Sequence, residues 1–227
     1  MSSPATHPPE VLDALRRYDT PTLSNGIETF DIRPRDTGFA SLEIRCLFPE
    51  MGTLVGYAAT GMIRARGQGP DDQSPLWRQV QDVPAPRFVV VQDLDDPPGH
   101  GSLWGEVNAT IFKALGCVGA ITNGCVRDLK EARELGFQFF ARGPGVSHAY
   151  VRVVAAGEEV SVGGLTVRPG DLLAADQHGV LSIPHPVAAE LPAACDRVVE
   201  REQNLLRWVR SAEFDAARLA EMRRVRH

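Results

Sequence analysis

The sequence has no closely spaced cysteine pair and no long apolar run. Its four cysteines are Cys46, Cys117, Cys125 and Cys195. None of them has the C-x-x-C spacing of a zinc or redox site, and Cys117 and Cys125 lie among small apolar residues, which favours buried thiols. The first residues contain no apolar signal core, and no apolar run approaches the length of a bilayer span. These absences predict a cytoplasmic protein without membrane contact.

A basic excess is also missing, together with the common nucleotide-binding and hydrolase motifs. Lysine and arginine total 24 against 29 aspartates and glutamates, a net charge of −5, which argues against a nucleic-acid surface. The G-x-G at 99–101 has no third glycine, and neither a P-loop nor a G-x-S-x-G elbow occurs. None of the six histidines pairs with another at the spacing of metal ligands. Nucleotide, zinc, serine-hydrolase and nucleic-acid functions are therefore not predicted.

The middle of the chain does contain a regular alternation of strand and helix patterns. In order, these are a strand at 87–96, a helix at 103–116, a strand at 117–122, a helix at 127–136 and a strand at 137–143. Each of the two helices ends in a glycine, which suits the position just after a helix. This order and spacing predict parallel strands joined by right-handed crossovers.

From about residue 150 the pattern changes to short strands separated by glycine and Pro-Gly turns, which is typical of antiparallel β structure. Two helices are then expected at roughly 186–210 and 212–224. No repeat or low-complexity linker divides the chain. We therefore predict one α/β domain over residues 1–227, with a core at about 10–185 and C-terminal helices at about 186–224.

Arg127 and Asp128 stand side by side where a predicted strand gives way to a predicted helix. Asp128 and Glu131 have the spacing of a capping box, so the aspartate can serve only to start the helix. The alternative is chemical, because α/β sheets bind ligands at the carboxyl ends of parallel strands. There Arg127 can hold a planar carboxylate and Asp128 a hard divalent cation. The residues alone leave both interpretations open.

Two further carboxylates stand out by their positions. Glu106 begins the helix after the preceding strand, and Gly99, Gly101 and Gly105 around it allow a ligand to approach the backbone closely. The simpler alternative is a first-turn glutamate favoured by the helix dipole. Glu202 interrupts the apolar stripe of the C-terminal helix, so it must be paired, bound to a metal or turned to a partner surface. A salt bridge between helices and a site role both fit Glu202.

The segments 99–143 and 164–184 resemble the RraA-like family, and the resemblance extends over roughly residues 10–210. It depends most on an acid followed about twenty residues later by Arg-Asp-x-x-acid, a pattern met by Glu106, Arg127, Asp128 and Glu131. The family contains the regulator of ribonuclease E activity and class II aldolases that release pyruvate. The resemblance implies a single-domain α/β/β/α sandwich similar to swivelling phosphohistidine domains, assembled as a homotrimer or homohexamer with sites between subunits.

Aldolase members of the family keep the Arg-Asp pair, whereas the ribonuclease regulator lacks the aspartate. The resemblance therefore favours a lyase that cleaves a 4-hydroxy-2-oxo acid to pyruvate or decarboxylates oxaloacetate. By that similarity, Asp128 would anchor Mg²⁺ or Mn²⁺, and Arg127 would bind the carboxylate and enolate oxygen of a small 2-oxo acid. Glu106 would hold water bound to the metal.

The resemblance also implies roles for the chain around these residues. The backbone at Gly105, Val107 and Asn108 would grip the substrate, and Glu202 would reach the site of a neighbouring subunit. Asn123 departs from the family, because many members carry aspartate there. Two alternatives therefore accompany the lyase prediction: a non-catalytic binding protein like the regulator, and a lyase or isomerase acting on another oxo acid.

Overall fold

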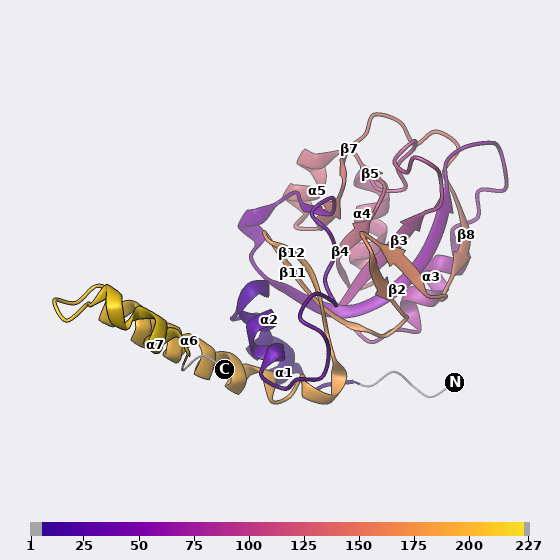
Figure 1. The fold of residues 1–227 in the computed structure, drawn as a ribbon. Coiled ribbons are helices and arrows are strands. Elements are labelled where there is room, and N and C mark those ends of the chain that lie inside the picture. The colour runs from indigo at the N-terminus through magenta and orange to yellow at the C-terminus, as the bar shows by residue number, and fades with distance from the viewer. Residues whose placement is uncertain (1–5, 225–227) are drawn as a thin grey trace.

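The computed structural model describes residues 6–224 and places a mixed sheet of eight strands at the centre of the molecule (Figure 1). The strands run in the order β1-β6-β4-β3-β2-β11-β12, and β8 pairs with the C-terminal part of β2, residues 61–64. Their bounds are β1 (Arg45–Cys46), β2 (Leu54–Arg64), β3 (Arg87–Asp93), β4 (Cys117–Thr122), β6 (Gln138–Ala141), β8 (Arg152–Ala156), β11 (Leu172–Asp176) and β12 (Gly179–Ile183).

The half of the sheet built from β2, β3, β4 and β6 is parallel, as the alternating pattern predicts. Three helices connect these strands: α3 (Ser74–Gln81), α4 (Glu106–Ala114) and α5 (Leu129–Leu135). Gly116 and Gly136 follow α4 and α5 with φ of 78° and 71°, a left-handed conformation that glycine adopts without steric cost. The glycine stops predicted for both helices are therefore confirmed.

The later strands are antiparallel, again as predicted. β11 pairs with both β12 and β2, and β9 (Val160–Val162) forms a hairpin with β10 (Leu165–Val167). The hairpin packs on one face of the sheet, where its side chains join alternate strand residues such as Phe88 and Val90. The intervening residues Val89 and Val91 face the helices instead. Helices and a second β layer thus cover opposite faces of the curled sheet, and the α/β class with its β-on-β core is confirmed.

Helices from both ends of the chain pack together beside β11 and β12 (Figure 1). They are α1 (Pro9–Leu15), α2 (Thr20–Glu28) and α6 (Leu191–Val209). The first half of α6 buries Leu191, Cys195 and Val198 against this group, whereas its second half and α7 (Leu219–Arg224) extend away from the body. The predicted C-terminal helices are therefore present, although α7 begins at residue 219 rather than near 212, after a short 3₁₀ turn at Ala216–Arg218.

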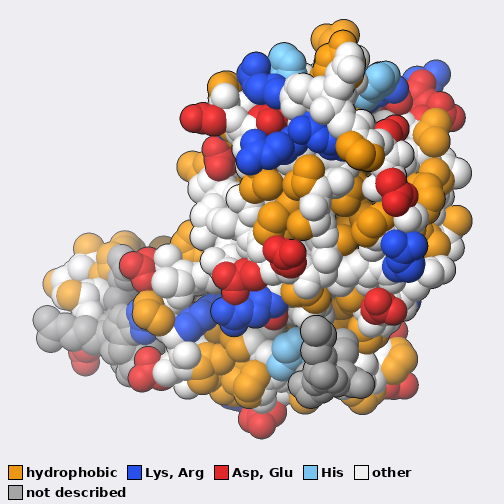
Figure 2. Space-filling view, turned by 90° about the vertical axis from the view of Figure 1, so that its right-hand side faces the viewer, with side chains coloured by type: hydrophobic (Ala, Val, Ile, Leu, Met, Phe, Trp, Pro, Cys, Tyr) orange, Lys and Arg blue, Asp and Glu red, His pale blue; other side chains and the backbone are white. Residues whose placement is uncertain are grey.

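Short elements complete the chain: β5 (Cys125–Val126), β7 (Gly143–Pro144), and the 3₁₀ turns at Pro49–Met51 and His185–Val187. Within residues 6–224, no helix is both long and apolar enough to span a bilayer. On the face seen in Figure 2, lysines and arginines are interspersed with acidic and hydrophobic side chains, so no single sign of charge dominates that face.

Candidate functional site

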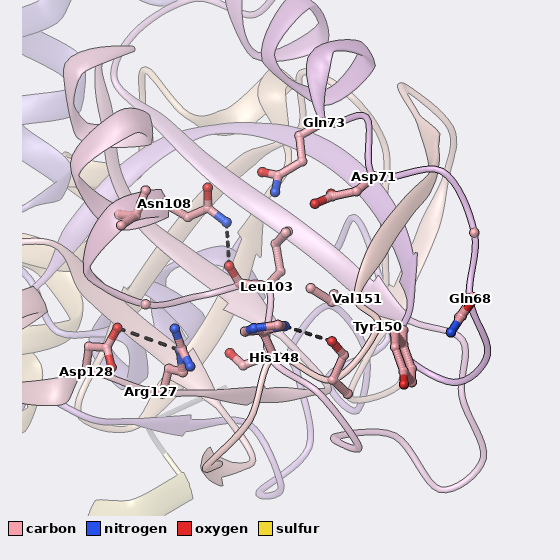
Figure 3. Close-up of a pocket in the computed structure, with 15 residues that line it drawn as sticks. Gln68, Asp71, Gln73, Leu103, Asn108, Arg127, Asp128, His148, Tyr150 and Val151 are labelled. Carbon is pink, nitrogen blue, oxygen red and sulfur yellow. Dashed lines mark hydrogen bonds and ion pairs between the residues drawn. The ribbon is translucent and has the colours of Figure 1, made fainter.

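A pocket of about 500 Å³ opens at the carboxyl ends of the parallel strands (Figure 3). The segments that follow β2, β3 and β4 each contribute to its wall, and residues 148–151 complete it. Its lining residues are Gln68, Gly69, Asp71, Gln73, Ser102, Leu103, Gly105, Val107, Asn108, Arg127, Asp128, His148, Ala149, Tyr150 and Val151. The predicted location of a ligand site at this edge of the sheet therefore coincides with a real cavity.

Arg127 and Asp128 lie together on one wall of this pocket, with their side chains 37% and 36% exposed. The Arg127 Nε atom is 3.7 Å from Asp128 Oδ2. The same oxygen accepts a hydrogen bond of 3.0 Å from the backbone N–H of Glu106, the first residue of α4. The Asp128 carboxylate thus links Arg127 to the start of α4, at Glu106, which lies 22 positions before Asp128 in the chain.

The capping-box interpretation of Asp128 is wrong. Asp128 precedes α5 with φ 54° and ψ 48°, and its side chain makes no capping hydrogen bond to that helix. A capping side chain reaches the amides of its own helix from an extended backbone conformation, which Asp128 does not have. Its left-handed conformation turns the carboxylate to the N-terminus of α4 instead.

Strained backbone gathers around the pocket. Asp31, Asp128 and Ala149 are the non-glycine residues with positive φ among those described, and the last two line the cavity. Such a conformation costs on the order of 1–3 kcal/mol and persists only where the surrounding structure imposes it. The Asp128 side chain contacts the Glu106 amide and Arg127, and Ala149 packs closely against Gly101, where an added Cβ would lie 2.8 Å from the Ala149 Cβ.

Gly105 lines the pocket, and the atoms around it leave no room for a side chain. A Cβ on this residue would lie 2.5 Å from Asp128 Oδ2 and 3.2 Å from Arg127 Nε. Its φ of −162° is ordinary extended backbone, so space rather than conformation requires glycine here. Of the glycines singled out from the sequence, Gly105 is therefore the one that touches the Arg-Asp pair.

Of the three predicted site residues at the start of α4, Val107 and Asn108 line the pocket and Glu106 does not. Val107 is 72% exposed and lines the pocket, and Asn108 lines it while donating a 2.6 Å hydrogen bond to the Leu103 carbonyl. Glu106 joins the site through its backbone amide, whereas its exposed side chain is not part of the pocket wall. The water-holding role of Glu106 stays a prediction.

Glu202 lies away from the pocket within a single chain. It is half-buried on α6 and lines a separate cavity of about 430 Å³. The other residues of that cavity are Asn25, Glu28, Thr29, Arg35, Val198 and Arg201. The sequence-predicted role of Glu202 in the site of a neighbouring subunit is untested by one chain and stays a prediction.

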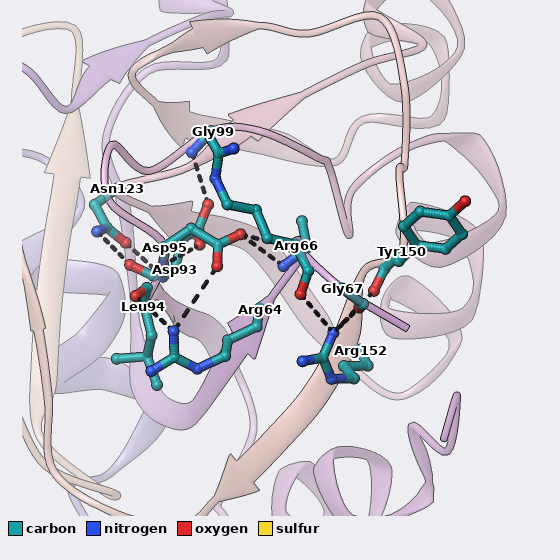
Figure 4. A network of polar contacts seen from close by, with 11 residues as sticks. Arg64, Arg66, Gly67, Asp93, Leu94, Asp95, Gly99, Asn123, Tyr150 and Arg152 are labelled. Atoms are coloured by element: carbon teal, nitrogen blue, oxygen red, sulfur yellow. Dashed lines mark hydrogen bonds and ion pairs between the residues drawn. The ribbon is translucent and has the colours of Figure 1, made fainter. Parts of the chain in front are cut away.

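Asn123 clamps the ends of β3 and β4 together behind the pocket (Figure 4). Its Oδ1 accepts a 2.7 Å hydrogen bond from the Asp93 N–H, and its Nδ2 donates a 3.0 Å bond to the Asp93 carbonyl. The buried Asp93 carboxyl group in turn accepts from the amides of Asp95 and Gly99, and burial raises its pKa. Asn123 therefore uses both its donor and its acceptor, which aspartate cannot do when ionised.

Further hydrogen bonds hold the loop after β2, which contributes Gln68, Gly69, Asp71 and Gln73 to the pocket wall. Asp95 Oδ2 accepts hydrogen bonds of 2.8 Å from Ala65 and 3.0 Å from Arg66 (Figure 4). The guanidinium group of Arg152 donates to the carbonyls of Arg66 and Gly67. These bonds occupy the side chains of Asp95 and Arg152 and fix the loop that carries Gln68 to Gln73.

Trp104 is a core residue that sets the position of the Arg-Asp pair. It is 1% exposed and packs against Phe112, Phe137 and Phe139. Its carbonyl accepts a 3.0 Å hydrogen bond from the Arg127 N–H. No motif in the sequence indicated this role of Trp104.

The thiols and the acidic groups bear on the chemistry of the site. Burial raises the pKa of Cys117 and of Cys195 to about 12, so these are inert thiols, as expected for Cys117. Among residues 6–224 there is no group of three or more His, Cys, Asp or Glu side chains arranged to hold a metal.

The family model described as Aldolase/RraA, of the RraA-like group, matches residues 9–182. The chain belongs to the RraA-like family. Among relatives of this RraA-like protein, one from Deinococcus radiodurans is 36% identical over 119 residues, which cover 48% of this chain and 69% of that protein. One from Halalkalibacterium halodurans is 34% identical over 81 residues, 35% of this chain. Both are named "Putative 4-hydroxy-4-methyl-2-oxoglutarate aldolase".

The RraA-like chain spans 39% of the length of the Halalkalibacterium protein, less than two thirds of that relative. A solved structure, RraAS2 of Streptomyces coelicolor, described as an unusual member of the RNase ES inhibitor RraA protein family, has a TM-score of 0.69. It is 23% identical and is matched over 92% of this chain and 100% of its own. At that identity the likeness extends to the fold alone.

Proposed function

We propose that this RraA-like protein is a divalent-metal-dependent lyase that cleaves a 4-hydroxy-2-oxo acid to pyruvate or decarboxylates oxaloacetate. The observation that carries the proposal is the pairing of the Arg127 guanidinium with the Asp128 carboxylate, 3.7 Å apart, on the wall of a pocket at the carboxyl ends of the sheet. The names of the Deinococcus and Halalkalibacterium relatives support a lyase of this kind.

The residues present fit a Mg²⁺ or Mn²⁺ ion. The Glu106 amide and Arg127 both contact the Asp128 carboxylate at Oδ2, and the side chain is 36% exposed and lines the pocket. Asp128 would therefore hold the cation through one carboxylate, with water completing the coordination, as is common for Mg²⁺. When bound, the cation supplies Lewis-acid stabilisation of the negative charge that develops on the 2-oxo oxygen.

Arg127 would bind the carboxylate of the pyruvyl group through its planar guanidinium and stabilise the enolate oxygen. In the retro-aldol step the C3–C4 bond breaks, and its electron pair becomes part of pyruvate enolate. C4 leaves as a carbonyl carbon, its hydroxyl proton passes to a base, and C3 later takes up a proton. Glu106, and Glu202 from a neighbouring copy, are the carboxylates proposed to handle these protons.

Coupled pyruvate release tests the proposal. The full chain is incubated with oxaloacetate, 4-hydroxy-2-oxoglutarate or a 2-oxo-3-deoxyaldonic acid, and pyruvate is measured with lactate dehydrogenase. We expect pyruvate to form with Mg²⁺ or Mn²⁺ and to stop on addition of EDTA, above the rate of a protein-free control with the same metal. If all three compounds give no metal-dependent pyruvate, the lyase proposal fails for these substrates, and a non-catalytic binding role or activity on another oxo acid is favoured.

Gly105→Ala is expected to reduce this activity at least tenfold with little loss of stability. The added Cβ would stand 2.5 Å from Asp128 Oδ2, so the carboxylate must leave its hydrogen bond with the Glu106 amide. The backbone tolerates alanine because φ is −162°, and the atoms that must move are ends of side chains. The measurements are kcat/KM and the midpoint of thermal unfolding. Thr110→Ala, on the exposed side of the same helix, is the control and should retain activity.

A further inference from the structure

We infer that the pocket selects a substrate whose tail beyond C4 is uncharged and hydroxylated, as in a 2-oxo-3-deoxyaldonic acid, rather than a dicarboxylate. The inference rests on the proposed lyase function and names the substrate class of that same site. Its basis is the chemistry of the pocket wall that lies across from Arg127 and Asp128.

The two walls of the pocket carry different groups (Figure 3). Arg127 and Asp128 stand together on one side, where the 2-oxo acid end of the substrate would bind. Asp71 and Gln73, from the segment before α3, project into the cavity from the other side. Gln68 and Tyr150 extend that second wall. A substrate held by Arg127 therefore directs its tail toward Asp71 and these neutral polar groups.

Charge disfavours a second carboxylate at this wall. Of the residues that line the pocket, Arg127 is the sole lysine or arginine, whereas Asp71 and Asp128 are both acidic. Arg152 is hydrogen-bonded to the carbonyls of Arg66 and Gly67 and does not line the cavity. A tail carboxylate would thus face the Asp71 carboxylate, and no lysine or arginine lines that wall to offset the repulsion.

Hydrogen-bonding capacity points the same way. The Asp71 carboxylate can only accept hydrogen bonds, and a tail carboxylate can also only accept. Gln73 Oε1 is buried and has no hydrogen-bond partner among the described residues, so this amide is not committed to holding the fold. A hydroxyl group both donates and accepts, so it can bond to Asp71 and to the Gln73 amide in either amide orientation.

Within residues 6–224, the Asp71 side chain makes no hydrogen bond or ion pair, in contrast to that of Asp72. Asp72 Oδ1 accepts a 2.9 Å hydrogen bond from the Ser74 N–H, the first amide of α3, and this bond lowers its pKa. Asp72 does not line the pocket. Asp71 is exposed and does line it. The two adjacent aspartates therefore provide a matched pair of variants, Asp71→Asn for the pocket and Asp72→Asn for the loop.

The first experiment compares kcat/KM, from coupled pyruvate release with Mg²⁺, for a 2-oxo-3-deoxyaldonic acid and for 4-hydroxy-2-oxoglutarate. We expect the hydroxylated monocarboxylate to be preferred at least tenfold. Asp71→Asn should raise kcat/KM for 4-hydroxy-2-oxoglutarate about fivefold or more, so the ratio of kcat/KM between the two substrates should fall. Asp72→Asn should leave kcat/KM for both substrates unchanged.

The second experiment measures binding without turnover. 2-Oxoglutarate and 5-hydroxy-2-oxopentanoate differ in their last carbon, a carboxylate in one and a hydroxymethyl group in the other, and neither has the C4 hydroxyl needed for cleavage. Calorimetric titration with Mg²⁺ present should show tighter binding of the hydroxymethyl compound. A preference for the dicarboxylate in both experiments, with metal-dependent pyruvate still released, overturns the inference and leaves the lyase function standing. Absence of metal-dependent pyruvate from every compound overturns both.

Discussion

Asp128→Asn is expected to lower metal-dependent pyruvate release by about two to three orders of magnitude. In the natural chain the Glu106 amide donates a 3.0 Å hydrogen bond to Asp128 Oδ2, and the side-chain oxygen of asparagine can accept the same bond. Asparagine also tolerates the φ of 54° at this position better than most residues. The substitution thus removes the negative charge while keeping the shape. Lewis-acid stabilisation is worth several kcal/mol, and each 1.36 kcal/mol changes a rate by about tenfold.

Two measurements separate charge from structure in this variant. The affinity for Mn²⁺, followed by the electron paramagnetic resonance of the free ion, should fall together with kcat/KM. The midpoint of thermal unfolding should change by only a few degrees, because the N-terminus of α4 keeps its partner. Glu134→Gln removes an exposed carboxylate from the same helix, outside the Arg-Asp-x-x-acid pattern, and should leave both quantities unchanged. Full activity in Asp128→Asn would show that Asp128 does not hold the metal.

The sequence predicted the regular part of the fold because periodicity is a local property. Apolar spacing and the glycines at 116 and 136 located α4, α5 and the strands between them, and the order of these elements implied a parallel sheet. The same order placed Arg127 and Asp128 at the carboxyl edge of that sheet, where the pocket lies.

What the sequence could not supply was contact between distant residues. Spacing assigned Asp128 to its own helix, but its partner is an amide 22 positions earlier, reached through a left-handed backbone conformation that no local pattern indicates. The wall formed by Asp71 and Gln73 was missed for the same reason, since their loop precedes α3 and lines the same pocket as Arg127 only in the folded chain. Neither residue belongs to a motif.

The apolar stripe of the C-terminal helix was also only partly interpretable. Periodicity showed a continuous stripe, but the body of the domain covers only its first half, where Leu191, Cys195 and Val198 are buried. Beyond it, Val209 is 37% exposed. Where a helix leaves its domain depends on how far the other elements extend, and this cannot be read from the stripe itself.

Asn123→Asp is expected to lower the free energy of unfolding at pH 7 by roughly 2 kcal/mol. The amide donates a 3.0 Å hydrogen bond to the Asp93 carbonyl, which an ionised carboxylate cannot do. The introduced carboxylate would instead meet that carbonyl oxygen, close to the buried Asp93 carboxyl group, whose pKa burial already raises. Urea unfolding at pH 7, compared with the natural chain, gives the difference.

The pH dependence identifies the cause of that loss. The introduced carboxyl group should have a raised pKa in the folded chain, so the folded state binds more protons than the unfolded state near that pKa. The loss of unfolding free energy is therefore complete above the pKa that the introduced group has in the folded chain. The loss shrinks as the pH falls toward about 3.9, the pKa of this group in the unfolded chain, because the protonated carboxyl group can again donate to the Asp93 carbonyl. Asn204→Asp, the same change on the exposed half of α6, should alter stability by less than about 0.5 kcal/mol at either pH. A deficit in Asn123→Asp that stays constant between pH 7 and pH 4.5 would contradict the proposed clamp, because loss of packing alone does not titrate.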